Sequence, residues 1–566
     1  MKRIAAVFFA LLLCLMLLSC EESNADTTFD ADTTLDEDTT QTAVESHEHI
    51  YHAATCITPR ICKICEETEG VALGHTWTDA TCEKPKSCIT CNAREGKALG
   101  HKWTEITFTE GERCTVCNAT GKPATKDTFD FDGYKYQVLI SNRSTKTPND
   151  FEPVNMKIEY GLGMAIHARK VRMFELYGVV LEYRADLRNN HAAEQRIKDQ
   201  FLAMSNDHDL AVINTYSAAS LALEGMLWDL NKVPYIDLTE SWWDEGIVRD
   251  LTISDSVYFA TGDITTTVDS FMNVTMHNKK LHQRYITDGT DVYSLAKEGK
   301  WTLDTVARLS KLASVDMTRD GVMDGRDRFG LLCGYDDIIA SVFSSGGGIA
   351  EIGADGHLRA TIESQNAIGA MKKYIEIMSD KNSVLNYQNS ERMRGESMLG
   401  IVEEQRALFF MTILNESFRF KDKTLDFGIL PFPKYDESQA EYTNSFNHGL
   451  AAFVAIPRYQ DNIERTGAVV QLLGYEGEHW IKPAYREYVL ERKDKVDEES
   501  RAVLDIILDN KVADIGACYG YANMPNTLVA LMESGDADRF TDVYVNSVKD
   551  SLRASNINSK LDKLKR

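Results

Sequence analysis

The stretch Asp-Leu-Ala-Val-Ile-Asn at residues 209–214 decides the fold class, together with the elements expected before it. A short apolar run between polar residues is typical of a buried strand. Upstream, residues 134–140 alternate like a strand, 165–177 are amphipathic, 179–183 are apolar and 192–204 are helix-like. Strands and helices that alternate with short connections predict an α/β lobe with a mostly parallel sheet.

The polar residues at the end of this run are the first candidates for ligand binding. Because parallel sheets bind ligands at the carboxyl ends of their strands, we expect Asn214, Tyr216 and Ser217 at a ligand-facing edge. The alternative is an ordinary turn, in which these side chains bond only to nearby backbone groups.

Two adjacent tryptophans, Trp242 and Trp243, are a second candidate feature. Neighbouring residues of a regular element point in different directions, so at least one indole is expected to be exposed or at a cleft. An exposed indole face could stack on a sugar ring. The alternative is that both tryptophans pack in the core or at an interface.

Six segments resemble, in the same order, family 1 extracellular solute-binding proteins of ABC importers. The resemblance extends from about Asp127 to the C-terminus and leaves out the cysteine-rich segment before it. The segments are DLNKVPYIDLTESWWD (Asp229–Asp244), SVYFATGDITTTVDSFMNVTMHNKKL (Ser256–Leu281), KEGKWTLDTVARLSKLASVDMTRDGVMDGRDRFGLL (Lys297–Leu332), EEQRALFFM (Glu403–Met411), LDFGILPFPKYDE (Leu425–Glu437) and FNHGLAAFVAIPR (Phe446–Arg458).

This resemblance implies a periplasmic-binding-protein-like clamshell of type II, which holds its ligand between two lobes and delivers it to ABC permease subunits. It implies lobe 1 at about 127–264 and 412–448, and lobe 2 at about 265–411 and 449–566. The chain is expected to cross between lobes near 263–267, 411–415 and 448–451. The implied cleft residues are Asn214, Tyr216, Trp242, Trp243, Asp263, Asn415, Phe446, Asn447, His448, Tyr519 and Tyr521.

The expected function is capture of a small solute, a carbohydrate or oligosaccharide, without catalysis. The sequence contains no G-x-S-x-G elbow, no Walker loop and no complete H-E-x-x-H signature. One alternative is a cell-surface sensor or adhesin that uses the same fold. A surface glycoside hydrolase is the weaker alternative, because carboxylates of unknown separation do not support a glycosidase mechanism.

The N-terminus predicts export and a lipid anchor. Lys2 and Arg3 precede a short apolar run, which is typical of a signal peptide over residues 1–19. The sequence Leu-Leu-Ser-Cys that ends at Cys20 resembles a bacterial lipobox, which implies a diacylglycerol on that thiol and removal of Cys14. We therefore expect the protein on the extracytoplasmic face of the cell membrane.

Acidic charge defines the next segment and excludes one class of partner. Residues 20–48 are Thr-rich and contain ten Asp or Glu and no Lys or Arg, so they predict an extended tether. The whole chain has 62 Lys+Arg and 86 Asp+Glu, a formal net charge of −24. Such a surface repels phosphate backbones, so nucleic acid is not an expected partner.

Residues 49–124 form a 26-residue repeat of cysteine and histidine. The units read His-Cys-Cys-Cys, each closed by a C-x-x-C pair, and Phe108 replaces the first cysteine of the third unit. We expect tetrahedral Zn²⁺ within each unit or, alternatively, disulfides, since exported thiols oxidise. The residues concerned are His49, Cys56, Cys62, Cys65, His75, Cys82, Cys88, Cys91, His101, Cys114 and Cys117.

One loop has the spacing of an EF-hand calcium loop. Aspartates and a threonine stand at the expected positions, and Gly321 stands at the sharp turn. A structural Ca²⁺ is the expectation, although Thr318 replaces Asp or Asn and the last ligand is Asp instead of Glu. An Asp/Gly-rich surface turn is the alternative. The candidate ligands are Asp316, Thr318, Asp320, Val322, Asp324 and Asp327.

Overall fold

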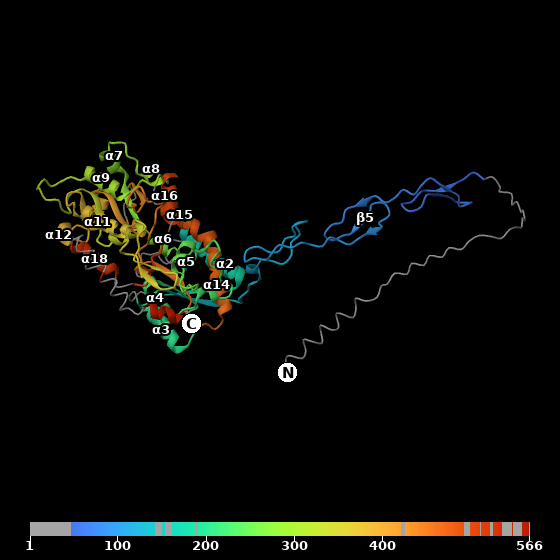
Figure 1. Ribbon diagram of the computed structural model, residues 1–566, viewed down its shortest axis with the longest axis horizontal. Coiled ribbons are helices and arrows are strands. Elements are labelled where there is room, and N and C mark those ends of the chain that lie inside the picture. The colour runs from blue at the N-terminus through green and yellow to red at the C-terminus, as the bar shows by residue number, and fades with distance from the viewer. Residues whose placement is uncertain are drawn as a thin grey trace, which may run out of the picture. The chain divides into compact units, whose positions relative to one another are not determined.

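The computed structural model describes residues 47–141, 150–152, 161–186, 191–419, 425–491, 498–509, 511–520, 524–534, 546 and 557–564 (Figure 1). The chain divides into two compact units. We call the chain up to Trp103, with Arg113–Ala119, the repeat module, and Thr104–Glu112 with Thr120–Arg566 the large body. The signal peptide, Cys14, Cys20 and nearly all of the tether lie outside the described residues. Within those that are described, no helix is both long and apolar enough to cross a membrane.

The repeat module consists of small three-stranded antiparallel sheets with the predicted period. Tyr51 pairs with Cys62 in the first sheet and Trp77 with Cys88 in the second, 26 residues on in both strands. Among the module's described residues, the buried apolar side chains are five cysteines. Thiols therefore occupy the place that a hydrophobic core would fill. The strands are β1 (Tyr51–His52), β2 (Arg60–Cys62), β3 (Thr68–Glu69), β4 (Trp77–Thr78), β5 (Lys86–Cys88) and β6 (Arg94–Glu95).

The first lobe of the large body has the predicted mostly parallel sheet, with strand order β17-β9-β7-β8. Strand β7 is parallel to both β8 and β9, and β17 is antiparallel to β9. All five elements expected around residues 209–214 are present, which confirms the α/β prediction. The elements are β7 (Tyr134–Ser141), α2 (Gly161–Tyr177), β8 (Val179–Asp186), α3 (Ala192–Ala203), β9 (Leu210–Asn214), α4 (Thr215–Leu223), α5 (Glu245–Leu251), β17 (Ala452–Ala455), α14 (Ile463–Glu476) and α15 (Lys482–Glu491).

The second lobe has a five-stranded mixed sheet in the order β14-β11-β15-β10-β16. Its central strands are buried except for Ile413 at the end of β15, and Trp301 packs against Phe409 with ring centroids 5.2 Å apart. The main elements are β10 (Asn273–Asn278), α7 (Lys279–Tyr285), α8 (Val292–Lys297), α9 (Leu303–Ala313), β11 (Phe329–Cys333), α10 (Asp337–Ser344), α11 (Gln365–Ser379), β14 (Val384–Asn386), α13 (Met398–Glu403), β15 (Ala407–Ile413), β16 (Phe427–Pro431) and α16 (Glu498–Asp509).

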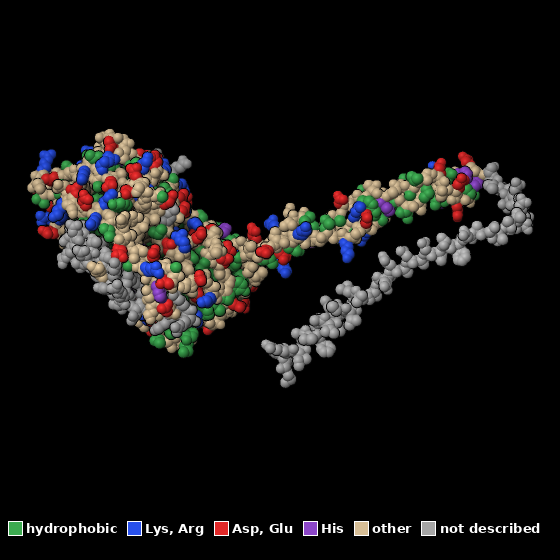
Figure 2. Space-filling view, in the orientation of Figure 1, with side chains coloured by type: hydrophobic (Ala, Val, Ile, Leu, Met, Phe, Trp, Pro, Cys, Tyr) green, Lys and Arg blue, Asp and Glu red, His purple; other side chains and the backbone are tan. Residues whose placement is uncertain are grey.

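Short elements complete the large body. They are η1 (Thr125–Thr128), η2 (Leu230–Lys232), α6 (Thr267–Ser270), β12 (Ala350–Ile352), β13 (Leu358–Ala360), α12 (Ser390–Met393), η3 (Leu414–Arg419), η4 (Gly477–Ile481), α17 (Ile515–Cys518), α18 (Met524–Ser534) and α21 (Ile557–Leu564). Lys and Arg are interspersed with Asp and Glu on the visible face of this body, which therefore shows no single acidic face (Figure 2).

The sheets correct the expected lobe boundaries. Strand β16 pairs with β10 in the second lobe, although residues 412–448 were expected in the first. Strand β17 pairs with β9 in the first lobe, although residues 449–566 were expected in the second. The chain therefore does not cross at 411–415, because β15 and β16 flank the same strand. The apolar runs of β16 and β17 look alike, and only long-range pairing separates them.

Two of the connections between the lobes lie side by side. Met272 on the outgoing connection pairs with Phe446 on the returning one. The N–H of Asn273 donates to the Ser445 carbonyl at 2.9 Å, and that of Asn447 donates to the Phe271 carbonyl at 2.8 Å. These backbone hydrogen bonds hold the two connections together. They therefore determine where the strand ends of the two lobes meet.

A close backbone contact before the first crossing gives a testable prediction. A Cβ added to Gly262 would lie 2.1 Å from the carbonyl oxygen of Trp242, which is backbone and cannot rotate away. Gly262→Ala should therefore destabilise the large body by about 1–3 kcal/mol or more. Thermal unfolding checks this. Gly400→Ala is the control, because its Cβ would meet only the Ser397 side chain at the start of α13; an equal loss in both variants would contradict the prediction.

Candidate functional site

A cavity of about 410 Å³ lies where the two lobes and their connections meet. Tyr216, from the first lobe, reaches it just after the end of β9. The second lobe contributes Asn273 from the start of β10 and Thr412 from the end of β15. The returning connection supplies the segment from Phe446 to Leu450. The remaining lining residues are Asp336, Asp337, Ile339, Ala340, Tyr387, Met398, Ile413, Glu416, Ala517, Asn526 and Val529.

The charge of this cavity is acidic. Its described lining residues include Asp336, Asp337 and Glu416 and no Lys or Arg. Burial and the neighbouring Asp336 carboxyl raise the pKa of Asp337 well above its usual range, and burial raises that of Asp336. The Oδ1 atom of Asp336 has no hydrogen-bond partner among the described residues. The Oδ1 atom of Asp336 can therefore accept a hydrogen bond from a ligand.

His448 is the neutral polar group of the cavity. It is 4% exposed, and burial lowers its pKa to about 3, so the ring is uncharged at neutral pH. Its Nε2 atom has no hydrogen-bond partner among the described residues, and its ring lies 4.4 Å from that of Phe446. An apolar ring beside a neutral imidazole suits a ligand with both C–H and O–H surfaces.

Four of the predicted ligand residues line this cavity: Tyr216, Phe446, Asn447 and His448. Asn214 and Ser217 support it from behind, because Asn214 Oδ1 accepts the Ser217 N–H at 3.0 Å and caps α4. This is the turn role weighed as the alternative for those two residues.

Two further predicted residues, Asn415 and Tyr519, do not line the cavity, and a third cannot be placed in it or outside it. Asn415 is buried beside Glu416, and Tyr519 is buried with its ring 5.8 Å from that of Phe259. Tyr521 lies outside the described residues.

Both tryptophans are buried, and they line a second cavity, of about 460 Å³, instead of the one described above. Trp242 is 2% exposed and packs between Phe108 and Tyr475, with ring centroids 5.8 and 5.9 Å away. Trp243 is also buried, and its Nε1 donates to Gln471 Oε1 at 3.2 Å. Neither lines the 410 Å³ cavity. A bent loop gives each indole its own apolar surroundings, which a regular element would not allow.

Asp263 lies in a separate cavity of about 460 Å³ beside the two tryptophans. Burial raises its pKa to about 6, and Lys482, whose Nζ lies 3.2 Å from Oδ2, opposes the shift. Nearby, the buried Lys511 ammonium contacts Asp244 at 2.9 Å and Asp269 at 2.8 Å. Asp263 therefore lies among paired charges in this second cavity and does not line the 410 Å³ cavity.

The raised pKa of Asp263 gives a pH-dependent prediction. The folded state binds this proton more tightly than the unfolded chain, so ionisation above pH 6 costs stability, up to about 3 kcal/mol for two pKa units. Asp263→Asn should raise the melting temperature above pH 6, with a gain that disappears below pH 4. Asp255→Asn, at an exposed turn, is the control; a gain that does not depend on pH would contradict the account.

Several cavity residues were missed by sequence reasoning. Asp336 and Asp337 follow the end of β11, and Thr412 lies at the end of β15. Both strands are parallel neighbours, so the rule that identified Tyr216 applies to them as well. The sequence therefore carried a signal for these residues, namely their position at strand ends. Using that signal required the strands of the second lobe to be recognised as one sheet.

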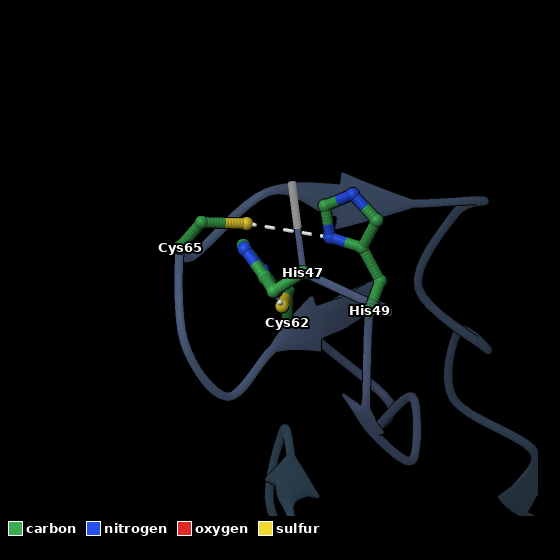
Figure 3. A group of neighbouring side chains, drawn as sticks. All are labelled: His47, His49, Cys62 and Cys65. Atoms are coloured by element: carbon green, nitrogen blue, oxygen red, sulfur yellow. Dashed lines mark hydrogen bonds between the residues drawn. The ribbon is translucent and has the colours of Figure 1, made fainter. Parts of the chain in front are cut away.

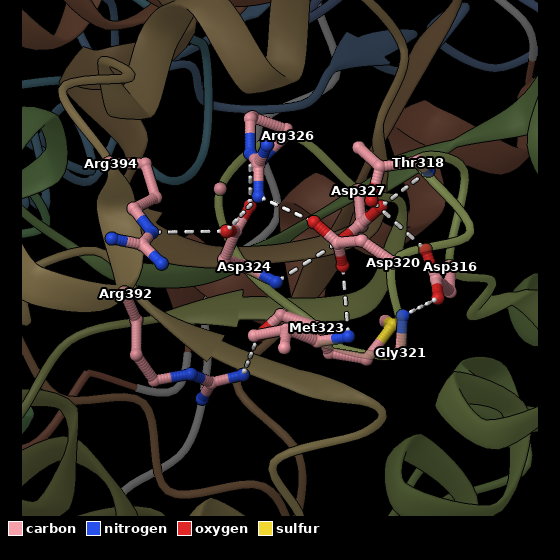
Figure 4. Close-up of polar contacts among 12 residues, drawn as sticks. Asp316, Thr318, Asp320, Gly321, Met323, Asp324, Arg326, Asp327, Arg392 and Arg394 are labelled. Carbon is pink, nitrogen blue, oxygen red and sulfur yellow. Dashed lines mark hydrogen bonds and ion pairs between the residues drawn. The ribbon is translucent and has the colours of Figure 1, made fainter.

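In the calcium-type loop, the candidate carboxylate ligands are already bonded to backbone N–H groups of the loop and to arginine side chains (Figure 4). Asp327 accepts the N–H groups of Met317, Thr318 and Asp324 at 2.8–3.1 Å. Arg326 bridges Asp320 at 2.9 Å and Asp324 at 2.6 Å. Arg394 adds a second guanidinium 3.1 Å from Asp324. These contacts supply the positive charge expected from Ca²⁺, so the geometry disfavours the calcium prediction.

This arrangement predicts how the loop responds to calcium and to substitution. Added Ca²⁺ should leave the melting temperature unchanged, because an ion would have to displace Arg326. Asp327→Ala should cost about 2–4 kcal/mol, because three N–H groups lose their acceptor. Asp320→Ala, which loses one exposed ion pair and one exposed hydrogen bond from the Val322 N–H, should cost less, about 1 kcal/mol. Stabilisation by calcium in a thermal-shift assay would restore the calcium interpretation.

Three groups of side chains in the repeat module could each hold a metal ion. The first joins His47 and His49 with Cys62 and Cys65 (Figure 3). The other two are Cys56, His75, Cys88 and Cys91, and Cys82, His101, Cys114 and Cys117.

The predicted grouping within single units is therefore wrong. Cys56 and Cys82, each the first cysteine of its unit, join the group of the following unit, because their loops fold forward. In place of a cysteine from an earlier unit, the first group contains His47, which sequence reasoning did not select.

Solved structures share the fold of the large body. A cyclo/maltodextrin-binding protein complexed with maltotetraose matches with a TM-score of 0.50 at 11% identity, over 75% of this chain and 99% of its own. A cyclic alpha-maltosyl-1,6-maltose binding protein from Arthrobacter globiformis matches with a TM-score of 0.48, 12% identity and coverages of 76% and 99%. No family model and no curated protein matches the chain. The fold is thus the two-lobed clamshell of solute-binding proteins, preceded by a Cys/His module.

Proposed function

We propose that the protein is a solute-binding protein that captures a saccharide in the 410 Å³ cavity. The observation that carries the proposal is the lining: Tyr216 and Phe446 offer ring surfaces, while Asn447, His448 and Asp337 offer polar atoms. Sugar rings present apolar C–H faces and hydroxyl edges, and this mixture matches both. Solved proteins of this fold are described with bound maltotetraose or cycloalternan, which is consistent with the proposal.

The acidic lining narrows the ligand class. A uronate or phosphorylated sugar would bring its negative charge into a lining that has three carboxyl groups, those of Asp336, Asp337 and Glu416, and no described Lys or Arg to balance that charge. A neutral saccharide donates hydroxyl hydrogen bonds to these carboxyl groups, and an amino sugar adds a favourable charge. The proposed ligand is therefore a neutral saccharide or amino sugar.

The proposal extends to the setting of the protein. Cys20 would carry the lipid, the acidic residues up to 48 would form the tether, and the large body would pass its ligand to ABC permease subunits. The lipobox-like Leu-Leu-Ser-Cys and the fold of the large body support this arrangement. Metabolic labelling with a fatty acid, lost in Cys20→Ser, tests the anchor.

A saccharide panel tests the ligand. Neutral oligosaccharides, glucosamine oligomers and oligogalacturonates are added to the full chain in a thermal-shift assay. At least one neutral or amino saccharide should raise the melting temperature by a few degrees at saturation, and the oligogalacturonates should not. No shift with any saccharide would overturn the function, and a shift with the oligogalacturonates alone would overturn the charge argument.

Two substitutions test whether the saccharide binds in this cavity. For the best saccharide, Tyr216→Ala should weaken affinity about tenfold by titration calorimetry, because a ring contact is lost. Tyr235→Ala removes an exposed tyrosine outside the cavity and should leave affinity unchanged. Equal affinities in both variants would place the saccharide elsewhere.

A further inference from the structure

Among the described residues of the repeat module, twelve side chains that can ligate a metal gather into three sets of four. In each set one nitrogen or sulfur atom per residue lies within 4.8 Å of the others. The first set offers two thiols and two imidazoles, and the second and third each offer three thiols and one imidazole. Four soft ligands at such a spacing are typical of closed structural zinc sites.

The distances fit a tetrahedron around one ion. Zn–S bonds of about 2.3 Å and Zn–N bonds of about 2.0–2.1 Å separate neighbouring ligand atoms by about 3.5–3.8 Å. The Sγ atoms of Cys56 and Cys88 lie 3.7 Å apart, and those of Cys82 and Cys114 also lie 3.7 Å apart. A disulfide would need about 2.05 Å. The geometry therefore favours metal over the disulfide alternative.

One histidine ring in each set is oriented with its Nδ1 atom toward the other ligand atoms. In each set Nδ1 of His49, His75 or His101 faces a cysteine Sγ at 3.2–3.4 Å. The opposite nitrogen of His49, Nε2, lies 3.3 Å from a carboxylate oxygen of Glu67. A carboxylate on the second nitrogen of a ligating histidine fixes its tautomer and orientation, as in other zinc sites.

From this geometry we infer that the repeat module binds three Zn²⁺ ions and that the second and third ions each join two consecutive units. Cys56 precedes the C-x-x-C pair of its own unit but faces His75, Cys88 and Cys91 of the next. Cys82 stands in the same relation to the third unit. The ions thus link the units in series, where a hydrophobic core is absent.

Both ends of the series are adapted to this linkage. No earlier unit supplies a cysteine to the first set, and His47 takes that place (Figure 3). At the other end no fourth unit follows, and Phe108 stands where a forward-reaching cysteine would be. Phe108 instead packs in the large body, with its ring 6.3 Å from Phe129 and 5.8 Å from Trp242. The linkage therefore explains why the third unit lacks its first cysteine, because no fourth unit follows whose ion that cysteine could bind.

Metal analysis of the full chain, purified without chelator, tests the number of sites. We expect three zinc ions per chain, falling to two in His47→Ala and remaining three in His52→Ala, which changes an exposed histidine outside the sets. Two ions in the unaltered chain, with none lost in His47→Ala, would restore the grouping within units. Absence of zinc together with absence of free thiols would mean disulfides. Either result overturns the inference.

Thiol labelling tests the linkage between units directly. Cys56→Ser should make Cys88 and Cys91 of the following unit react with an alkylating agent, as read by peptide mass spectrometry. Cys62 and Cys65, in the unit that contains Cys56, should stay protected by their own ion. The reverse labelling pattern would contradict the linkage. Because the readout is local, it remains informative if the variant unit loses its fold.

Discussion

Backbone pairing between two of the connections that join the lobes is the constraint on which the site depends. The Phe271–Asn273 segment leaves the first lobe, the Ser445–Asn447 segment returns to it, and their hydrogen bonds hold the two side by side. The ends of β9 and β15 and the start of β10 therefore meet at one place. Tyr216, Thr412 and the residues after Phe446 come from distant parts of the sequence and line one cavity for this reason.

Sequence reasoning correctly predicted the features that depend on local sequence pattern. The five elements up to β9 follow from period and turn chemistry, and Tyr216 follows from the position of ligands at strand ends. The lobe boundaries do not follow, because β16 and β17 are similar apolar strands and only pairing assigns them. The indoles of Trp242 and Trp243 are buried in a bent loop and line the second cavity, which the adjacent pair in the sequence could not distinguish from the first.

In the repeat module, too, local features were predictable from the sequence and long-range contacts were not. Its period and ligand types could be read from the sequence, but the assignment of ligands to sites could not. A C-x-x-C pair is local, whereas the choice of Cys56 or Cys82 as the remaining thiol depends on how each loop folds. His47 was overlooked because it lies outside the 26-residue period.

The central claim is that the cavity at the lobe connections captures a saccharide. Hydrogen–deuterium exchange of the full chain, with and without a mixture of neutral and amino saccharides, tests it most directly. The account predicts slower exchange around Tyr216, from Asn273 to His277, and from Phe446 to Leu450. Unchanged exchange in these segments, or protection confined to the cavity beside Trp242 and Asp263, would contradict it.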